Sequence, residues 1–163
     1  MSTMDNLKEA FAGESQANRK YLAFAKKADE EGYAQVAKLF RAAADAETVH
    51  AHAHLRVMNG IGSTEENLNQ AINGETEEFK SMYPRMMEEA KAEGNDAAYM
   101  SFANANAVEE IHAGLYRKAL DNLGNNEETD YYVCQVCGNT VEGEAPEKCP
   151  ICGAPKKMFK KID

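Results

Sequence analysis

The chain has 163 residues, which fits one domain of ordinary size or one domain with a small module attached. A formal net charge of −9 with 44% hydrophobic residues indicates a folded soluble protein, and the lack of a basic stripe argues against nucleic acid or an anionic membrane surface as partners. Neither a signal peptide nor an apolar run of membrane-spanning length is recognisable, so we expect a cytoplasmic protein.

Two helices are predicted in the first third of the chain. Residues near 3 to 31 form the first, which Gly32 ends, and the second continues to about residue 60. Each carries a seam at helical spacing that is apolar except for a few acidic and polar members. The first seam is Leu7, Phe11, Glu14, Asn18, Tyr21, Ala25 and Ala28, and the second is Val36, Leu39, Ala43, Glu47, His50, His54 and Val57. A carboxylate on a core-facing seam is costly unless it is paired or binds a metal ion.

Two further helices follow the same plan. Ser63 and Glu66 are spaced as a capping box that opens the third helix, which stops near Gly94, and the fourth runs from about residue 95 to 123. Pro84 inside the third helix removes one backbone hydrogen bond and is expected to bend its axis. The third seam is Leu68, Ile72, Glu75, Phe79, Met82 and Met86, and the fourth is Phe102, Ala105, Glu109, His112, Tyr116, Leu120 and Leu123.

The four helices are two copies of one hairpin. Glu47 follows Glu14 by 33 residues and Glu109 follows Glu75 by 34, so each hairpin brings one glutamate level with a Glu-x-x-His motif on its second helix. Positions i and i+3 share a helix face, which directs each motif's glutamate and histidine the same way. Two copies of this motif on two predicted seams are not chance.

Four glutamates and two histidines in one bundle are the ligand pattern of ferritin-like proteins that hold two iron or manganese ions. Four close carboxylates in a core cannot all remain ionised without cations, and two divalent ions balance their charge. Carboxylate and imidazole ligands suit iron or manganese, although ligand type alone also permits zinc. The predicted fold is therefore mainly α, a ferritin-like four-helix bundle, with the ligands Glu14, Glu47, His50, Glu75, Glu109 and His112.

Three further residues lie close enough along the helices to belong to this site. Glu78 is three residues after Glu75 and shares part of its face, so it is either a fifth carboxylate or a solvated member of an acidic run. Tyr21 and Tyr83 lie about two turns beyond Glu14 and Glu75, where they either hydrogen-bond to the ligands or fill the core.

The last part of the chain differs in composition from the helical part and contains all four cysteines. We divide the chain into a bundle domain over residues 1–124, a polar linker over 125–130 and a small module over 131–163. The module holds two Cys-x-x-Cys pairs, which predict a tetrahedral metal site in a reducing compartment rather than disulfides: Cys134, Cys137, Cys149 and Cys152. Four thiolates hold either zinc or a single iron. Iron is favoured because a one-electron carrier tethered to a two-iron site makes a redox system.

These motifs make the chain resemble the rubrerythrin family over nearly its whole length. The matching segments are Gly13-Glu14-Ser15-Gln16, Glu47-x-x-His50, Gly74-Glu75-Thr76-x-Glu78, Glu109-x-x-His112 and the two cysteine pairs of a rubredoxin-like tail. The resemblance implies two Fe in the bundle and one Fe on the four cysteines of each chain. It also implies that Glu78 is a ligand of the oxidised site and exchanges with His50 on reduction, so that both residues take part in catalysis.

The resemblance further implies an enzyme, a peroxidase of oxidative-stress defence that reduces hydrogen peroxide to water. Its electrons come from an NAD(P)H-linked reductase or a separate rubredoxin and pass through the rubredoxin-like iron. Electron counting agrees, because cleaving the O–O bond of peroxide takes two electrons and a two-iron site supplies two. Asn139 departs from the pattern, since rubredoxin-type modules usually carry an aromatic residue there, and we expect it to leave that iron more exposed.

Two other functions use the same features. A ferroxidase or iron-storage protein is built on the same bundle but gains little from a tethered electron donor. A zinc-ribbon interaction module explains the cysteines alone, and the acidic composition disfavours it.

The connection between the second and third helices predicts a homodimer. In a ferritin-like bundle these helices run parallel, so the connection must return about 31 Å along the axis and step ~8–10 Å sideways. Residues 59–67 reach roughly 30 Å when fully extended, which is too short or barely enough. When two protomers exchange hairpins, the short connection no longer has to return along the bundle. We therefore expect a homodimer that exchanges helix hairpins.

Overall fold

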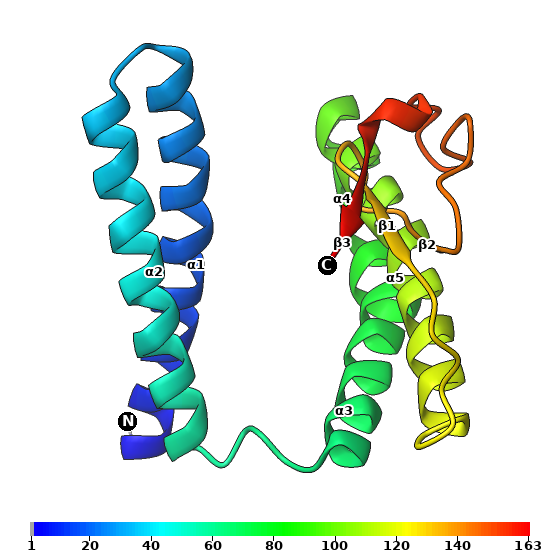
Figure 1. Ribbon diagram of the computed structural model, residues 1–163, viewed down its shortest axis with the longest axis horizontal. Helices are drawn as coiled ribbons and strands as arrows, with labels where there is room; N and C mark the ends of the chain where they lie inside the picture. The colour runs from blue at the N-terminus through cyan, green and yellow to red at the C-terminus, as the bar shows by residue number, and fades with distance from the viewer. Residues whose placement is uncertain (1) are drawn as a thin grey trace. The chain divides into compact units, whose positions relative to one another are not determined.

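The computed structural model describes residues 2–163 (Figure 1). Its chain forms two compact units, Met1–Gly62 and Ser63–Asp163, and Met1, the first residue of the expected bundle domain, lies outside the described residues. The elements in chain order are α1 (Thr3–Glu30), α2 (Ala34–Val57), α3 (Thr64–Glu77), the π-helical segment η1 (Glu78–Met82), α4 (Tyr83–Ala92), α5 (Asp96–Asp121), β1 (Tyr131–Cys134), β2 (Thr140–Glu142), the 3-10 turn η2 (Lys156–Met158) and β3 (Phe159–Ile162). The prediction of a mainly α fold followed by a small module is confirmed.

The first unit is a hairpin of two long helices. Ser2 and Asp5 form a capping box at the start of α1, and Gly32 adopts φ +85° in the turn that leads to α2. Alanines line the interface between the helices and are at most 6% exposed: Ala25 and Ala28 on α1, and Ala37, Ala44 and Ala51 on α2. Side chains this small let the two backbones pack closely along the whole hairpin.

Part of the seam predicted for α2 is not covered within the single chain. Val36, Leu39 and Val57 are 45%, 67% and 65% exposed, whereas the alanine strip faces α1. A single partner helix covers only one narrow strip of α2, so the larger apolar side chains of the predicted seam need a different partner. The first unit therefore carries an apolar helix face that α1 does not cover.

The second unit begins with the predicted capping box. Ser63 Oγ accepts from the backbone N–H of Glu66 at 3.2 Å, and Glu66 Oε2 accepts from the N–H of Ser63 at 2.7 Å. The third helix stays helical from α3 through η1 to α4, with a π turn at η1. Pro84 then falls in the first turn of α4, where no helical N–H is needed. The structure places a π turn, a feature that occurs often at functional sites, just before Pro84, and the bend expected there stays a prediction.

The strand module completes this unit. Its sheet has the order β2-β1-β3, with Tyr132 opposite Val141 on one side and Lys161 on the other. Its centre is built from Cys134, Cys149 and Ala154, packed against Met158 and Phe159 among others. A module this small has little apolar core, so the sulfur atoms take that place.

The module is joined to α5 by the segment 122–130, which stays against the helix. Asn126 Nδ2 donates to the carbonyl of Ala119 at 2.9 Å. Further along, Lys118 Nζ on α5 lies 2.8 Å from Glu142 Oε2 on β2. Among the described residues, no helix combines the length and the apolar character that crossing a membrane requires.

Candidate metal centres

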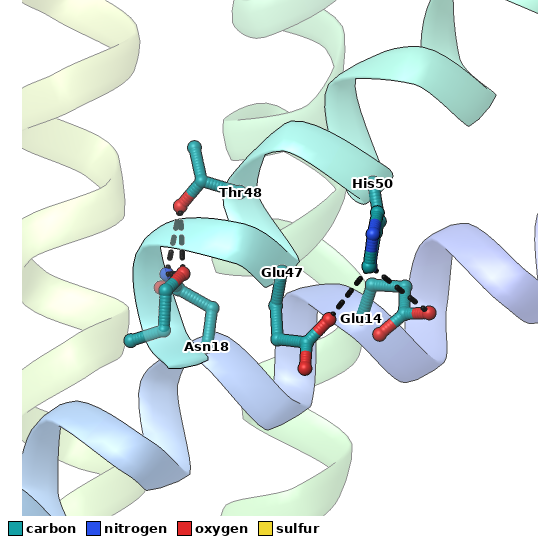
Figure 2. A network of polar contacts seen from close by, with 6 residues as sticks. Glu14, Asn18, Glu47, Thr48 and His50 are labelled. Carbon is teal, nitrogen blue, oxygen red and sulfur yellow. Dashed lines mark hydrogen bonds and ion pairs between the residues drawn. The ribbon is translucent and has the colours of Figure 1, made fainter. Parts of the chain in front are cut away.

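The first hairpin brings three of the predicted ligands together. Glu14 extends from α1, and Glu47 and His50 extend from one face of α2 (Figure 2). His50 Nδ1 lies 2.9 Å from Glu47 Oε2 and 4.0 Å from Glu14 Oε1. All three side chains offer ligand atoms within 4.8 Å of one another.

A polar contact beside these ligands fixes the two helices in register. Asn18 Nδ2, one turn after Glu14, donates to the carbonyl of Ala44 at 2.7 Å and to Thr48 Oγ1 at 2.8 Å (Figure 2). The contact crosses from α1 to α2 next to Glu47. It therefore holds Glu14 level with the Glu47–His50 pair.

The second unit repeats the arrangement. His112 Nδ1 lies 2.8 Å from Glu109 Oε2 on the same helix and 3.8 Å from Glu75 Oε1 on α3. These three residues also form a set whose ligand atoms lie within 4.8 Å. The six predicted bundle ligands thus form two sets of three, one in each unit.

Both sets have the spacing that a bound transition-metal ion requires. Two ligand atoms held at about 2.1 Å from an ion and at right angles to each other lie ~3.0 Å apart. The Nδ1–Oε2 separations of 2.9 Å and 2.8 Å match this edge length. The donor sets, two carboxylates and one imidazole each, therefore fit a non-haem iron ion.

Glu78 and two tyrosines lie near the second set. The pKa of Glu78 is raised by burial and by the Glu109 carboxylate, and His112 opposes this shift. The pKa values of Tyr83 and Tyr116 are raised by burial first and then by nearby carboxylates that include Glu109. Glu78, at the start of η1, therefore faces the same acidic cluster as the predicted ligands.

Sequence reasoning considered Tyr83 but missed Tyr116. Tyr116 stands four residues after His112 on the predicted seam, and this spacing was the available signal. Tyr21, in contrast, makes aromatic contacts with Phe24 and Phe40 at centroid distances of 6.3 Å and 6.2 Å. Its predicted contact with the ligands stays a prediction.

The acidic cluster holds a proton when no metal is present. Burial, the charge of Glu109, a hydrogen bond with Glu109 and the charge of Glu78 raise the pKa of Glu75 from 4.5 to about 7. Because the folded state binds this proton more tightly than the unfolded state, its stabilising effect is complete below pH 4.5 and is lost as the pH rises through 7. A cation at this position substitutes for the proton.

This linkage predicts how stability depends on pH. With the cysteine site loaded and the bundle free of metal, we expect the neutral variant Glu75→Gln to unfold at a higher temperature than the wild type at pH 8. The difference should shrink towards pH 5, where Glu75 is protonated in the wild type. Thermal unfolding followed by circular dichroism measures both chains. A constant difference from pH 5 to pH 8 would contradict the raised pKa of Glu75.

The four cysteines form a third set. The Sγ atoms of Cys134 and Cys152 are 3.7 Å apart, and those of Cys137 and Cys149 are 3.6 Å apart. Sulfur ligands at about 2.3 Å from a tetrahedral ion lie ~3.8 Å from one another. The set therefore matches a four-thiolate site, and disulfides are excluded because all four cysteines are free.

The thiols need a cation as the carboxylates do. Burial raises the pKa of Cys137, and the neighbouring sulfurs add to this shift although the Asn139 backbone opposes it. Burial also acts to raise the pKa of Cys149, but backbone hydrogen bonds from Cys152 and Ile151 outweigh it and lower this pKa to about 6. One thiolate thus forms readily beside thiols that stay protonated, and a metal ion removes this conflict.

The expectation that Asn139 leaves the iron more exposed stays a prediction, because Cys134 and Cys149 are buried while Cys137 and Cys152 are partly exposed. Asn139 is itself 1% exposed, and its Nδ2 donates to Cys149 Sγ at 3.6 Å. Cys134 and Cys149 are 1% and 2% exposed. The short amide side chain of Asn139 therefore folds inward and donates to one sulfur of the set.

The helices and the strand module together define a metalloprotein with two carboxylate–imidazole sets and one four-thiolate set. Comparison with protein families matches residues 5–120 to Rubrerythrin and residues 132–160 to Rubrerythrin, rubredoxin-like domain. The chain therefore belongs to the rubrerythrin family. It is an oxidoreductase of the di-iron, oxidative-stress class, with two non-haem irons in the bundle and one iron on four cysteines.

Individual relatives agree over almost the full chain. Nigerythrin of Nitratidesulfovibrio vulgaris is 38% identical over 97% of this chain and 85% of its own length. Rubrerythrin-2 of Clostridium acetobutylicum is 37% identical over 96% of this chain and 95% of its own length. The solved structure of fully reduced, all-ferrous nigerythrin covers 99% of this chain and 87% of its own, with 37% identity and a TM-score of 0.61.

Proposed function

We propose that this protein reduces hydrogen peroxide to water with electrons that pass through the four-cysteine iron. One observation carries the proposal: in the second unit His112, one of the predicted bundle ligands, is in hydrogen-bond contact with Thr140, a residue of the thiolate module. An electron donor placed against a two-iron ligand set suits a site that is reduced again after each turnover. An iron store has no such need.

The reaction balances with the groups that the site holds. Hydrogen peroxide takes up two electrons and two protons and gives two molecules of water, so the O–O bond breaks and two O–H bonds form. The two irons, when bound, supply two electrons and Lewis acidity. Burial and then the Glu109 carboxylate raise the pKa of Glu78, so this side chain would be suited to hold and donate one of the two protons.

We assign the ligands from these positions. The bundle ligands are Glu14, Glu47, His50, Glu75, Glu78, Glu109 and His112, and the thiolate ligands are Cys134, Cys137, Cys149 and Cys152. Glu78 and His50 exchange as ligands between the oxidised and reduced states. Glu78 begins the π turn, where the backbone departs from regular α geometry, and His50 has a side chain that is 56% exposed, so both have room to move.

The electron donor is an NAD(P)H-linked reductase or a separate rubredoxin in the cytoplasm. Cys137 and Cys152 are partly exposed, whereas Cys134 and Cys149 are buried. Electrons therefore enter most directly near the partly exposed pair. Thiolate ligation without disulfides suits a reducing compartment.

A turnover assay separates this function from iron storage. After reconstitution with iron, elemental analysis should give three Fe per chain, and peroxide should be consumed continuously when a reductase and NAD(P)H are supplied. A ferroxidase or storage protein would instead oxidise added Fe²⁺ to a mineral and consume little peroxide per NAD(P)H. The proposal fails if mineral forms and NAD(P)H-driven peroxide consumption stays at background.

We further propose a homodimer that exchanges hairpins. Only six residues, 58–63, connect α2 to α3. To return from the end of α2 to the start of a parallel α3 the chain must cover ~32 Å along the axis, and six residues with their flanking bonds reach roughly 25 Å. The uncovered face with Val36, Leu39 and Val57 is then packed by the second hairpin of the partner. Each site then takes Glu14, Glu47 and His50 from one chain and Glu75, Glu109 and His112 from the other, with Glu78 of that second chain added in the oxidised state.

Hybrid dimers test this assembly. Chains with Glu47→Ala and chains with Glu109→Ala are each expected to be inactive, because each variant damages every site of its homodimer. After the two variants are refolded together, exchanged heterodimers should regain one intact site of two. Two-tag purification isolates the heterodimers for iron analysis and peroxide assay. No recovery in purified heterodimers would mean that each site is built within one chain.

A further inference from the structure

Thr140, the first residue of β2, lies against the ring of His112 on α5. Thr140 Oγ1 is 2.8 Å from His112 Nε2 and 3.1 Å from the carbonyl oxygen of Gly138. The other ring nitrogen of His112, Nδ1, faces Glu109 Oε2 at 2.8 Å. Both polar atoms of the imidazole thus have partners, one from the helices and one from the thiolate module.

The two contacts of the Thr140 hydroxyl determine where the protons are. A hydroxyl has one proton, and a carbonyl oxygen can only accept, so the proton of Thr140 points to Gly138. The hydroxyl oxygen must then accept from His112, which places the ring proton on Nε2. In the neutral ring the lone pair of Nδ1 is left to face the Glu109 carboxylate, whereas a doubly protonated ring donates from Nδ1 to that carboxylate. Two lone pairs at 2.8 Å repel each other unless a cation lies between them.

We propose that Thr140 is a positioning residue that fixes His112 as the Nε2–H tautomer and presents Nδ1 to the metal ion. The inference rests on the proposed di-iron ligation by His112. A partner on the second ring nitrogen sets both the tautomer and the ring orientation of a metal-binding histidine. Here that partner belongs to the rubredoxin-like module, so the module that delivers electrons also completes a ligand of the site that receives them.

The first hairpin lacks an equivalent partner. His50 contacts Glu47 and Glu14 through Nδ1, and among the described residues no side chain contacts its Nε2. The side chain of His50 is 56% exposed, compared with 27% for His112. One histidine is therefore held on both sides and the other on one side only.

Two substitutions at Thr140 separate the hydroxyl from the rest of the side chain. Thr140→Val keeps the shape but removes the acceptor, whereas Thr140→Ser keeps the hydroxyl. We expect Thr140→Val to weaken zinc binding at the His112 position by about 10- to 100-fold, the usual effect of losing a partner of a ligating histidine. Thr140→Ser should remain close to the wild type. The metal content of the cysteine site should not change in either variant.

Nuclear magnetic resonance reads the tautomer directly. In the full chain loaded with zinc, a diamagnetic substitute for iron, the His112 Nε2 proton should be visible and slow to exchange with water. His112→Gln assigns the signal. The signal should persist in Thr140→Ser and be lost or exchange at least ~10-fold faster in Thr140→Val. Thr64→Val is the matched control, because Thr64, the first residue of α3, is exposed and lies outside the ligand sets.

The position of the His112 proton and the effect of Thr140→Val together test the role of Thr140. A proton on Nδ1 in the wild type overturns the inference, and so does a Thr140→Val chain that keeps both the protected Nε2 proton and wild-type zinc affinity. If Thr140→Val fails to fold, the wild-type spectrum and Thr140→Ser still give the answer. A chain with the expected tautomer and no peroxide reduction would refute the proposed function and leave the role of Thr140 intact.

Discussion

Replacing Glu109 with alanine is expected to empty the di-iron site. Glu109 lies 2.8 Å from the ligand His112, and its charge and hydrogen bond also act on Glu75, so one substitution disturbs all three groups of the set. Loss of an outer partner of a metal ligand costs about 10- to 100-fold in affinity or activity, and loss of a ligand should cost more than the upper figure. Iron should fall from three atoms per chain to one, and peroxide turnover to background.

Glu110→Ala is the matched control for this variant. Glu110 is the next residue on α5, is exposed and carries the same charge. It should keep three irons and full turnover. Elemental analysis and the visible spectrum follow the two kinds of site separately. If Glu109→Ala retained all three irons, Glu109 would not be a ligand, whatever its effect on activity.

Cys152→Ser is expected to separate electron delivery from peroxide chemistry. Without one of its four sulfur ligands the module should lose its iron or its red ferric thiolate colour. Turnover driven by NAD(P)H and a reductase should then fall by more than about 100-fold. The di-iron site, reduced chemically beforehand, should still react once with peroxide. Stopped-flow spectroscopy measures the single reaction, and NAD(P)H consumption measures the cycle.

Val136→Ala controls for changes in the same loop. Val136 lies between Cys134 and Cys137 and is 55% exposed, so its truncation should leave both reactions unchanged. The assignment of the module as electron conduit would be wrong if Cys152→Ser lost the single reaction while its bundle kept two irons. It would also be wrong if steady turnover survived without the thiolate iron.

Features with a local cause could be predicted from the sequence. The capping box at Ser63 and Glu66 depends on residues three apart, and so does the pairing of Glu109 with His112 on one helix face. The cysteine set follows from two short loops. In each case nearby residues determine the geometry, and distant parts of the chain add little.

Features that depend on a distant partner could not be predicted. Helical periodicity marked an apolar seam on α2 but could not tell that alanines would meet α1 while Leu39 remained uncovered. The contact of Thr140 with His112 joins residues that are 28 apart in sequence, and no sequence motif predicts it. The inward turn of Asn139 depends on a nearby sulfur, which a pattern of residue types does not place. Pro84 predicted a bend in the third helix, but the pattern of residue types did not predict the π turn before it.

The short segment 122–130 has a kinetic consequence. Because it keeps the thiolate module beside α5, the module meets His112 at an effective concentration in the millimolar range, as short tethers generally allow. A donor that diffuses freely at micromolar levels would meet the same surface roughly a thousand times less often. In the proposed function, the external reductase or rubredoxin therefore does not have to reach the di-iron ligands. It only has to reduce the iron of the thiolate module, which already lies beside the di-iron ligands. The slow collision with the external donor can therefore occur after one peroxide molecule has been reduced and before the next one binds.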